Sequence, residues 1–337
     1  MKKLYTLSFV LLASLSFAQL VSFTGTGTLI SNGWQTHSGT AGQLSILATA
    51  SDSGNSLSRA GFAPSAGNRA TTVAGNSEDA NIALTATITS GTAYYSVLVK
   101  YMDATTLATN GDYSLCLTSV AATNTTAFQA RIYAKPGTTP NTVAVGVLNN
   151  SGGTAAPSYA TTEIAVNATH LLVVKYDLAT NTGSLFVNPT AGAAEPAASA
   201  TNATGTTAAP SQIAGFAVRQ GGAVVPTATA GTGNMEFDEI RVGTTWASVT
   251  PTTLSTQSNT IVGLSIYPNP VTDGQFFVTS NGGLQKNVSV FDVLGKQVLK
   301  ASITDSAINV ANLKSGVYFV KVTEEGKTAT RKLVINN

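Results

Sequence analysis

Residues 170–188, HLLVVKYDLATNTGSLFVN, decide how the chain folds, because two apolar runs flank a short polar segment. The first run covers residues 170–177 and the second covers residues 184–188. Asn181 and Gly183, which lie between them, are residue types that take a positive φ at low cost. Two extended runs joined by such a turn predict an antiparallel β-hairpin.

The same pattern of short runs, separated by Gly, Asn, Thr and Pro, extends over residues 19–248 with almost no helical periodicity. Residues 95–101 alternate as a strand with one side for a core. Runs at residues 213–219 and 235–242 close this domain, and the low-complexity stretch 191–210 is expected to be a surface loop. We therefore predict an all-β fold in which residues 19–248 form a large two-sheet jelly-roll sandwich.

Residues 128–135 also alternate, so the pattern assigns each side chain to one of two faces. One face is expected to carry Phe128, Ala130, Ile132 and Ala134, and the other Gln129, Arg131, Tyr133 and Lys135. The strand thus has one side for a core.

The composition favours an exported protein. The chain has 337 residues, of which 43% are hydrophobic and only 10% charged, which is typical of extracellular β proteins rather than helical cytosolic enzymes. Residues 19–250 contain 8 Lys/Arg against 11 Asp/Glu, whereas residues 262–337 contain 8 against 5. A mildly acidic first domain with no basic stripe gives no reason to expect nucleic acid as a partner.

The N-terminus has the features of a signal peptide. Lys2 and Lys3 precede an apolar run over residues 4–17, and small residues allow cleavage between Ala18 and Gln19. We predict that residues 1–18 direct the chain to the Sec machinery. No stretch reaches the ~18 consecutive apolar residues of a membrane helix, so we expect no transmembrane segment.

Residues 249–261 are rich in Ser and Thr and are predicted to be a linker. Residues 262–337 then form a second β module, in which two prolines flank Asn269 and Gly295 supplies the geometry of a hairpin turn. The residues that define this module are Pro268, Asn269, Pro270, Gly295, Gly316, Tyr318 and Lys332.

These residues, in this order, resemble the type A C-terminal sorting domain of the type IX (Por) secretion system of Bacteroidota. The resemblance implies a small Ig-like β-sandwich that is recognised by the outer-membrane translocon and then removed by a sortase-like peptidase. It also implies passage through the periplasm to an extracellular or surface-attached location. The first domain, which we name the cargo domain, is similar to LamG-type, concanavalin A-like jelly rolls in its runs at residues 170–177, 185–189 and 237–243.

Candidate catalytic and metal residues are few. The only local acidic cluster, Glu236 to Glu239, lacks a third acid where a two-carboxylate glycosidase of this fold would place one, because Ile240 and Arg241 follow. We expect solvated acids there, with an ion pair to Arg241. The lone Cys116 excludes a disulfide framework and is expected to be buried. No metal site or cofactor is predicted, although Ca²⁺ remains possible with Asp52, Asp79, Asp103 or Asp112 as donors.

A binding site needs only an aromatic platform and a few polar groups. The candidates are Trp34, His37, Arg219 and Gln220. We therefore predict a secreted or cell-surface protein that is not an enzyme and whose cargo domain binds glycan or serves in adhesion. The alternatives are a polysaccharide hydrolase or lyase and a purely structural surface protein.

Overall fold

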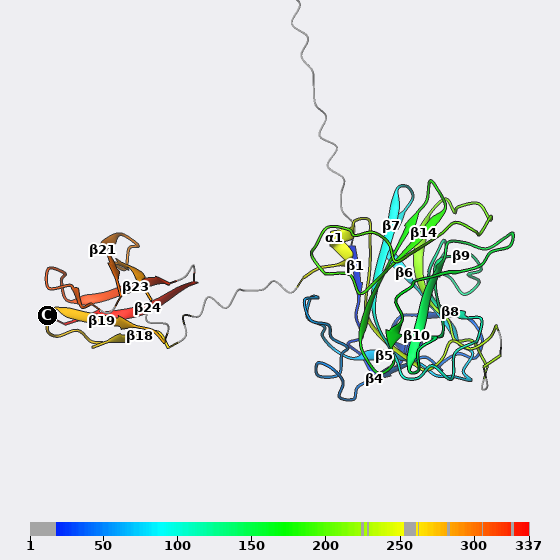
Figure 1. The fold of residues 1–337 in the computed structure, drawn as a ribbon, viewed down its shortest axis with the longest axis horizontal. Coiled ribbons are helices and arrows are strands. Elements are labelled where there is room, and N and C mark those ends of the chain that lie inside the picture. The colour runs from blue at the N-terminus through cyan, green and yellow to red at the C-terminus, as the bar shows by residue number, and fades with distance from the viewer. Residues whose placement is uncertain are drawn as a thin grey trace, which may run out of the picture. The chain divides into compact units, whose positions relative to one another are not determined.

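The computed structural model describes residues 18–223, 226–227, 229–252, 261, 263–281, 284–304, 306–324 and 327–336. The chain divides into two compact units, Met1–Thr253 and Leu254–Asn337, which are described separately (Figure 1). The predicted signal peptide before Ala18 and most of the predicted linker lie outside the described residues. None of the described helices has the length and apolar character needed to span a membrane.

The N-terminal unit is a two-sheet antiparallel β-sandwich, which confirms the predicted fold class. In spatial order its first sheet contains β15 (Ala200–Asn202), β14 (Thr182–Val187), β13 (His170–Asp177), β7 (Thr92–Tyr101), β17 (Met235–Gly243), β5 (Arg69–Thr72), β4 (Ser45–Leu47) and β2 (Gly27–Thr28), and β1 (Ala18–Val21) also pairs with β17.

The second sheet contains, in order, β11 (Ser158–Tyr159), β10 (Thr142–Leu148), β9 (Phe128–Pro136), β8 (Asp112–Thr118), β16 (Ile213–Val218), β6 (Asp79–Ile88) and β3 (Gln35–Ser38), and β12 (Ile164–Ala165) also pairs with β10. The short helices are η1 (Ile30–Asn32) and α1 (Trp246–Val249).

The hairpin predicted from residues 170–188 is present as β13 and β14, which pair from Leu172 with Val187 to Asp177 with Thr182. Asn181 takes the positive φ of the turn, at 51°. Gly183 is extended within β14 instead, and a Cβ there would lie 3.2 Å from Val147 Cγ2 of the other sheet. Glycine at this position therefore serves close packing of the sheets, not the turn.

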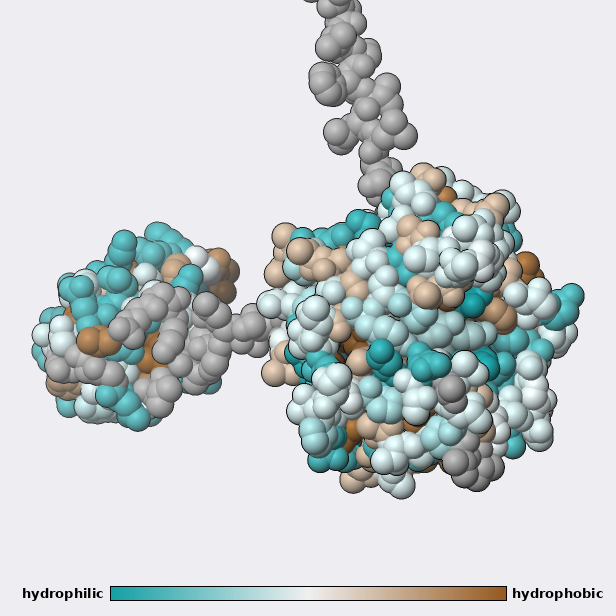
Figure 2. All heavy atoms as spheres, turned by 45° about the vertical axis from the view of Figure 1, so that its right-hand side comes forward, coloured by the Kyte–Doolittle hydropathy of each residue, from teal (hydrophilic) through white to brown (hydrophobic). Residues whose placement is uncertain are grey.

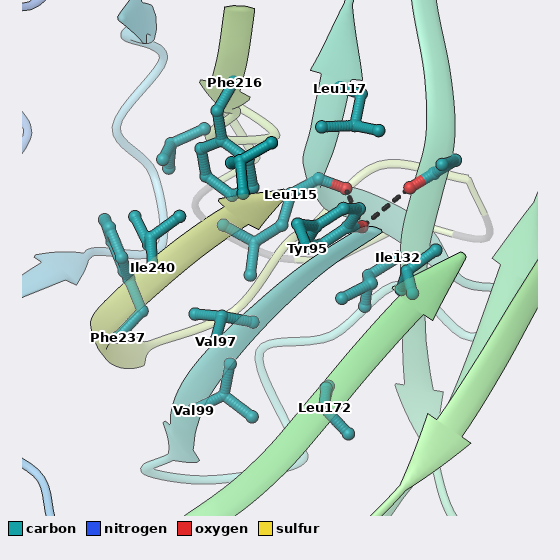
Figure 3. Packing of buried hydrophobic residues seen from close by; sticks show 14 of the residues in the cluster. Tyr95, Val97, Val99, Leu115, Leu117, Ile132, Leu172, Phe216, Phe237 and Ile240 are labelled. Atoms are coloured by element: carbon teal, nitrogen blue, oxygen red, sulfur yellow. Dashed lines mark hydrogen bonds between the residues drawn. The ribbon is translucent and has the colours of Figure 1, made fainter. Parts of the chain in front are cut away.

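A buried hydrogen bond joins the two sheets within the core. Tyr95 of β7 is fully buried, and its hydroxyl donates to the carbonyl oxygens of Ala130 at 2.6 Å and Leu115 at 3.5 Å (Figure 3). Both acceptors belong to the second sheet. Because a buried carbonyl without a partner is costly, this hydroxyl fixes β7 against β8 and β9.

Ala130 forms a β-bulge, with a φ of 51° and a break in the register between β8 and β9. The bulge corrects the predicted faces of this strand. Ala130, Ile132 and Ala134 lie in the core, but Phe128 does not, since its ring contacts Tyr113 and His37 on the outer side of the sheet. A one-residue insertion shifts the side-chain alternation before the bulge.

The C-terminal unit has two small sheets around its own core, as expected for the predicted Ig-like sandwich. The three-stranded sheet contains β18 (Ser265–Tyr267), β19 (Gln275–Thr279) and β22 (Ile308–Asn309). The four-stranded sheet contains β21 (Gln297–Ile303), β20 (Lys286–Phe291), β23 (Gly316–Glu324) and β24 (Lys327–Ile335).

Asn269 explains the proline-flanked motif in physical terms. Its side-chain amide donates to the carbonyl oxygen of Lys332 and accepts from the amide of Val334, each at 2.9 Å. Neither proline can donate a backbone hydrogen bond. The Asn269 side chain instead forms with β24 the two hydrogen bonds that the backbone of a neighbouring strand would form. Gly295 has a φ of 81° in the β20–β21 turn, as its predicted role requires.

Tyr95→Phe is expected to lower the free energy of unfolding of the cargo domain by about 1–3 kcal/mol, because it leaves the Ala130 carbonyl without its hydroxyl donor. Chemical denaturation of the purified protein measures the change. Tyr113→Phe is the control, since it removes the same atom from a half-buried ring and should change stability by less than about 0.5 kcal/mol. Equal losses in the two variants would contradict the assigned role.

Asn269→Ala is expected to speed hydrogen exchange at the Val334 amide by about tenfold, since the amide loses its acceptor and about 1.4 kcal/mol of protection. Site-resolved exchange by NMR on the full chain measures this. The same substitution at the exposed Asn287 of β20 should leave Val334 unchanged. Unaltered exchange in Asn269→Ala would show that the side chain does not hold β24.

Candidate functional site

Two of the four predicted ligand residues lie away from any open face. Trp34 is 4% exposed and packs in the core against Phe23 and Phe216, so the prediction that it forms an aromatic platform is wrong. Gln220 is 3% exposed, and its side-chain oxygen accepts from the Val73 amide. Large aromatic side chains stabilise the fold most when they are buried, which decides the place of Trp34.

The other two candidates, His37 and Arg219, lie on the outer face of the second sheet, where aromatic rings form a continuous series. Tyr113 of β8 lies 5.7 Å from Tyr133 and 6.2 Å from Phe128, measured between ring centroids. Phe128 in turn lies 5.4 Å from the ring of His37 on β3. All four rings are partly exposed, so they can contact a ligand.

Cationic side chains lie over these rings. The guanidinium carbons of Arg131 and Arg219 lie 5.0 and 4.6 Å from the centroid of Tyr113. Lys135 Nζ lies 4.2 Å from the centroid of Tyr159 on β11. These distances are within the range of cation–π contacts, which hold each charge in place without neutralising it.

The pairing of charges distinguishes this face. Five of the eight Lys and Arg residues of the cargo domain form ion pairs within 4.0 Å, and Arg219 does so with Asp112 at 2.5 Å. Among the described residues, Arg131, Lys135 and Arg59 have no carboxylate within that distance. Arg131 and Lys135 lie four residues apart on β9 with Tyr133 between them. We name Tyr113, Arg131, Tyr133, Lys135 and Tyr159 the cationic face.

Gly146 allows the far end of this face to form. It pairs with Tyr133 on one side and Tyr159 on the other. A Cβ at this position would lie 2.8 Å from Tyr159 Cδ1, so only glycine lets that ring lie close over β10. The tyrosines on both sides of Gly146 therefore extend the aromatic surface across three strands.

Burial sets the protonation of several groups on this side of the sheet. It raises the pKa of Tyr113 and Tyr133, so both hydroxyls stay protonated at neutral pH and can donate hydrogen bonds. Burial also lowers the pKa of His37, whose Nδ1 lies 3.0 Å from the Asn81 amide nitrogen. Because the Asn81 amide nitrogen donates, His37 Nδ1 accepts, and the neutral imidazole carries its proton on Nε2. The face consequently offers cations and donors that suit an anionic ligand.

Asp79, which lies beside Arg219, titrates close to physiological pH. Burial raises its pKa to about 6, against the opposing effect of Arg219, with smaller raising effects from Asp112 and Glu78. Its carboxylate lies 4.0 Å from Arg219 Nε. Asp79 therefore offsets part of the charge of Arg219 only when it is ionised.

The acidic cluster on β17 has a structural role. Glu236 forms a buried ion pair with Arg69 at 2.7 Å, and Asp238 is fully buried and accepts from the Leu57 amide at 3.0 Å. Glu239 pairs with Arg241 at 2.6 Å, as predicted, although these acids are buried and not solvated. They anchor the segment before β5 on the outer side of the first sheet. A pair of catalytic acids would flank a bound substrate, whereas these three side chains are buried and engaged in the contacts above.

The possible calcium donors are not gathered at one place. Asp52 pairs with Lys100, Asp103 accepts from Thr106, and Asp79 and Asp112 both approach Arg219. In the described part of the chain, no three His, Cys, Asp or Glu side chains are grouped to hold a metal ion. Cys116 is buried as predicted, and burial raises the pKa of its thiol to about 12.

The residues of the cationic face were not predicted as a site from the sequence, apart from the neighbouring Arg219 and His37. The alternation of Arg131, Tyr133 and Lys135 was visible in the sequence, and it was a signal for one polar, aromatic face. The partners of that face, Tyr113 and Tyr159, come from other strands and carry no local signature. The net charge of the domain also gave no sign of these cations, because its 11 Asp and Glu residues outnumber its 8 Lys and Arg residues.

Two lyases share sequence with part of this chain. A segment of 89 residues is 35% identical to "Ulvan lyase NLR42" of Nonlabens ulvanivorans, and it covers 25% of this chain and 16% of the relative. A segment of 95 residues is 26% identical to "Endo-acting ulvan lyase" of Formosa agariphila, covering 27% and 18%. The matches thus span less than a fifth of either relative. They nevertheless contradict the prediction that the chain is not an enzyme.

Solved structures also resemble the chain. A protein named "Sialidase" has a TM-score of 0.40 at 10% identity, covering 68% of this chain and 18% of its own. The legume lectin-like domain of Entamoeba histolytica has a TM-score of 0.35 at 10% identity, covering 66% and 95%. Both scores are too low to support an argument about function.

Residues 265–336 match the family model described as "Secretion system C-terminal sorting domain". The match includes all seven residues predicted to define the module, from Pro268 to Lys332. The C-terminal unit is therefore a type IX secretion system C-terminal sorting domain, and the protein is exported to the extracellular or cell-surface side.

Proposed function

We propose that the cargo domain binds an acidic polysaccharide along the cationic face of its second sheet. The observation that carries the proposal is the absence of a carboxylate partner for Arg131 and Lys135 on a face formed by aromatic rings. Aromatic side chains stack on the apolar faces of sugar rings, whereas the two cations pair with carboxylate or sulfate groups.

A polymer suits this face better than a small anion does. Exposed ion pairs contribute only about 0.2–1 kcal/mol each, so a single charged sugar would bind weakly. A polysaccharide that contacts several cations and rings at once adds these small contributions without the full entropic cost of association for each.

We propose further that the Sec machinery exports the protein before the type IX translocon and a sortase-like peptidase act on it.

A second candidate function is cleavage of the same polysaccharide, and the likeness to two ulvan lyases favours it. In an elimination, water would take the C–H proton beside the sugar carboxylate, the bond to the leaving oxygen would break, and that oxygen would take a proton from water. A guanidinium beside the sugar carboxylate would stabilise the negative charge that develops there. Elimination creates an unsaturated sugar, so ultraviolet absorbance of the products distinguishes cleavage from binding alone.

The double substitution of Arg131 and Lys135 by Gln is expected to weaken binding to acidic polysaccharides by tenfold or more, which corresponds to at least about 1.4 kcal/mol. A microarray of uronate-containing, sulfated and neutral polysaccharides, probed with the purified protein, measures the effect. The expected result is selectivity for the acidic polymers and a loss of affinity at higher salt.

Arg59→Gln is the matched control for charge, because Arg59 also has no carboxylate partner but donates to the Thr169 carbonyl on another part of the domain. It should bind as the unaltered protein does. An equal loss in Arg59→Gln would indicate a general effect of net charge, and preference for neutral polymers would overturn the proposal.

Affinity for a sulfated polysaccharide is expected to rise by about three- to tenfold between about pH 7.5 and about pH 5. Asp79, whose pKa is about 6, becomes neutral over this range and no longer offsets Arg219. Sulfate esters stay ionised, so the ligand does not contribute to the change. Asp79→Asn should bind with nearly constant affinity over the range, and an unchanged pH profile in that variant would contradict this assignment.

A further inference from the structure

A hollow opens near the end of the β8–β9 hairpin, apart from the cationic face. Its volume is about 420 Å³, within the roughly 300–1,000 Å³ of most ligand sites. Its walls come from the β8–β9 loop, the segment after β10 and the segment before β16, and they carry hydroxyl and amide groups but no charged side chain. The polar lining includes Ser119, Thr126, Gln129, Asn150, Thr207 and Gln212.

Gln129 is the unusual member of this lining. The side chain is 2% exposed, and its Oε1 is buried without a hydrogen-bond partner. A buried amide oxygen in this state costs about 1–3 kcal/mol, so proteins rarely leave one unpaired. Its neighbour Phe128 lies on the outer face of the sheet. Because successive strand residues point to opposite sides, the Gln129 side chain points away from that face.

The other amides of the hollow are already engaged and hold its walls in place. Asn150 Nδ2 donates to the carbonyl oxygens of Thr207 and Ala208, at 3.1 and 3.3 Å. Gln212 Nε2 donates to the Ser119 carbonyl at 3.3 Å. The walls are thus preorganised, and among the buried side-chain atoms of the described lining the Gln129 oxygen has no hydrogen-bond partner.

We propose that this hollow binds a short neutral saccharide, with the Gln129 side-chain amide forming a hydrogen bond to a sugar hydroxyl. An uncharged lining supplies no opposite charge to an anionic or cationic ligand, and its many hydroxyl and amide groups match a ligand rich in hydroxyls. The hollow does not use Arg131 or Lys135, so this inference stands apart from the proposed function of the cationic face.

The test is a ligand-observed NMR titration of the full chain with the methyl glycosides of glucose, galactose, mannose, xylose and rhamnose. At least one glycoside should saturate with a Kd in the millimolar range. Gln129→Met should weaken that binding by tenfold or more while leaving thermal stability equal or higher, because it removes an unpaired polar group without changing the volume much. If Gln129 had a purely structural role, Gln129→Met would lower the thermal stability of the protein instead.

Two further variants complete the design. Ala208→Trp, at an exposed position on the rim, should block the hollow and abolish binding. The Arg131→Gln and Lys135→Gln double variant should bind the glycoside normally, which separates this site from the cationic face. Absence of saturable binding to all five glycosides, or equal binding by Gln129→Met, would overturn the proposal.

Discussion

The hydrogen bond from the Tyr95 hydroxyl to the Ala130 carbonyl is the interaction on which both candidate sites of the cargo domain depend. It joins the two sheets at the β-bulge of β9. Because the bulge inserts one residue, Phe128 lies on the outer face with the cationic residues while Gln129 lines the separate hollow. This buried polar contact thus lies at the bulge that sends Phe128 and Gln129 to opposite sides of the sheet.

Charge is used differently on the two sheets. On the first sheet, acids of β17 are buried with Arg69 and Arg241 or accept from backbone amides, and so they hold a long segment on the sheet. On the second sheet, Arg131 and Lys135 lie over tyrosine rings without acids. Buried pairs of the first kind hold structure in place, whereas cations of the second kind are not neutralised by a carboxylate. Figure 2 shows one face of the molecule, on which the surface of this domain is mostly hydrophilic or neutral with scattered hydrophobic spots.

The two units of the chain differ in whether a local sequence motif marks their important residues. In the sorting domain, the Asn269 side chain pairs with β24, so the proline-flanked motif secures the last strand of the domain. In the cargo domain, no comparable motif identifies the cationic face, which is built from strands far apart in sequence. A local motif identifies the destination of the protein, and an assembled surface supports the proposal for its ligand.

The sequence by itself determined the all-β fold, the hairpin over residues 170–188, burial of Cys116 and the sorting domain, because alternation, turn residues and local motifs are short-range signals. It did not determine the face of Phe128, the burial of Trp34 or the gathering of Tyr113, Tyr133 and Tyr159. Those features depend on the bulge at Ala130 and on strand order, which join residues remote in the chain. Only the tertiary structure decided them, since hydrogen bonding between the sheets and packing in the core act across long sequence separations.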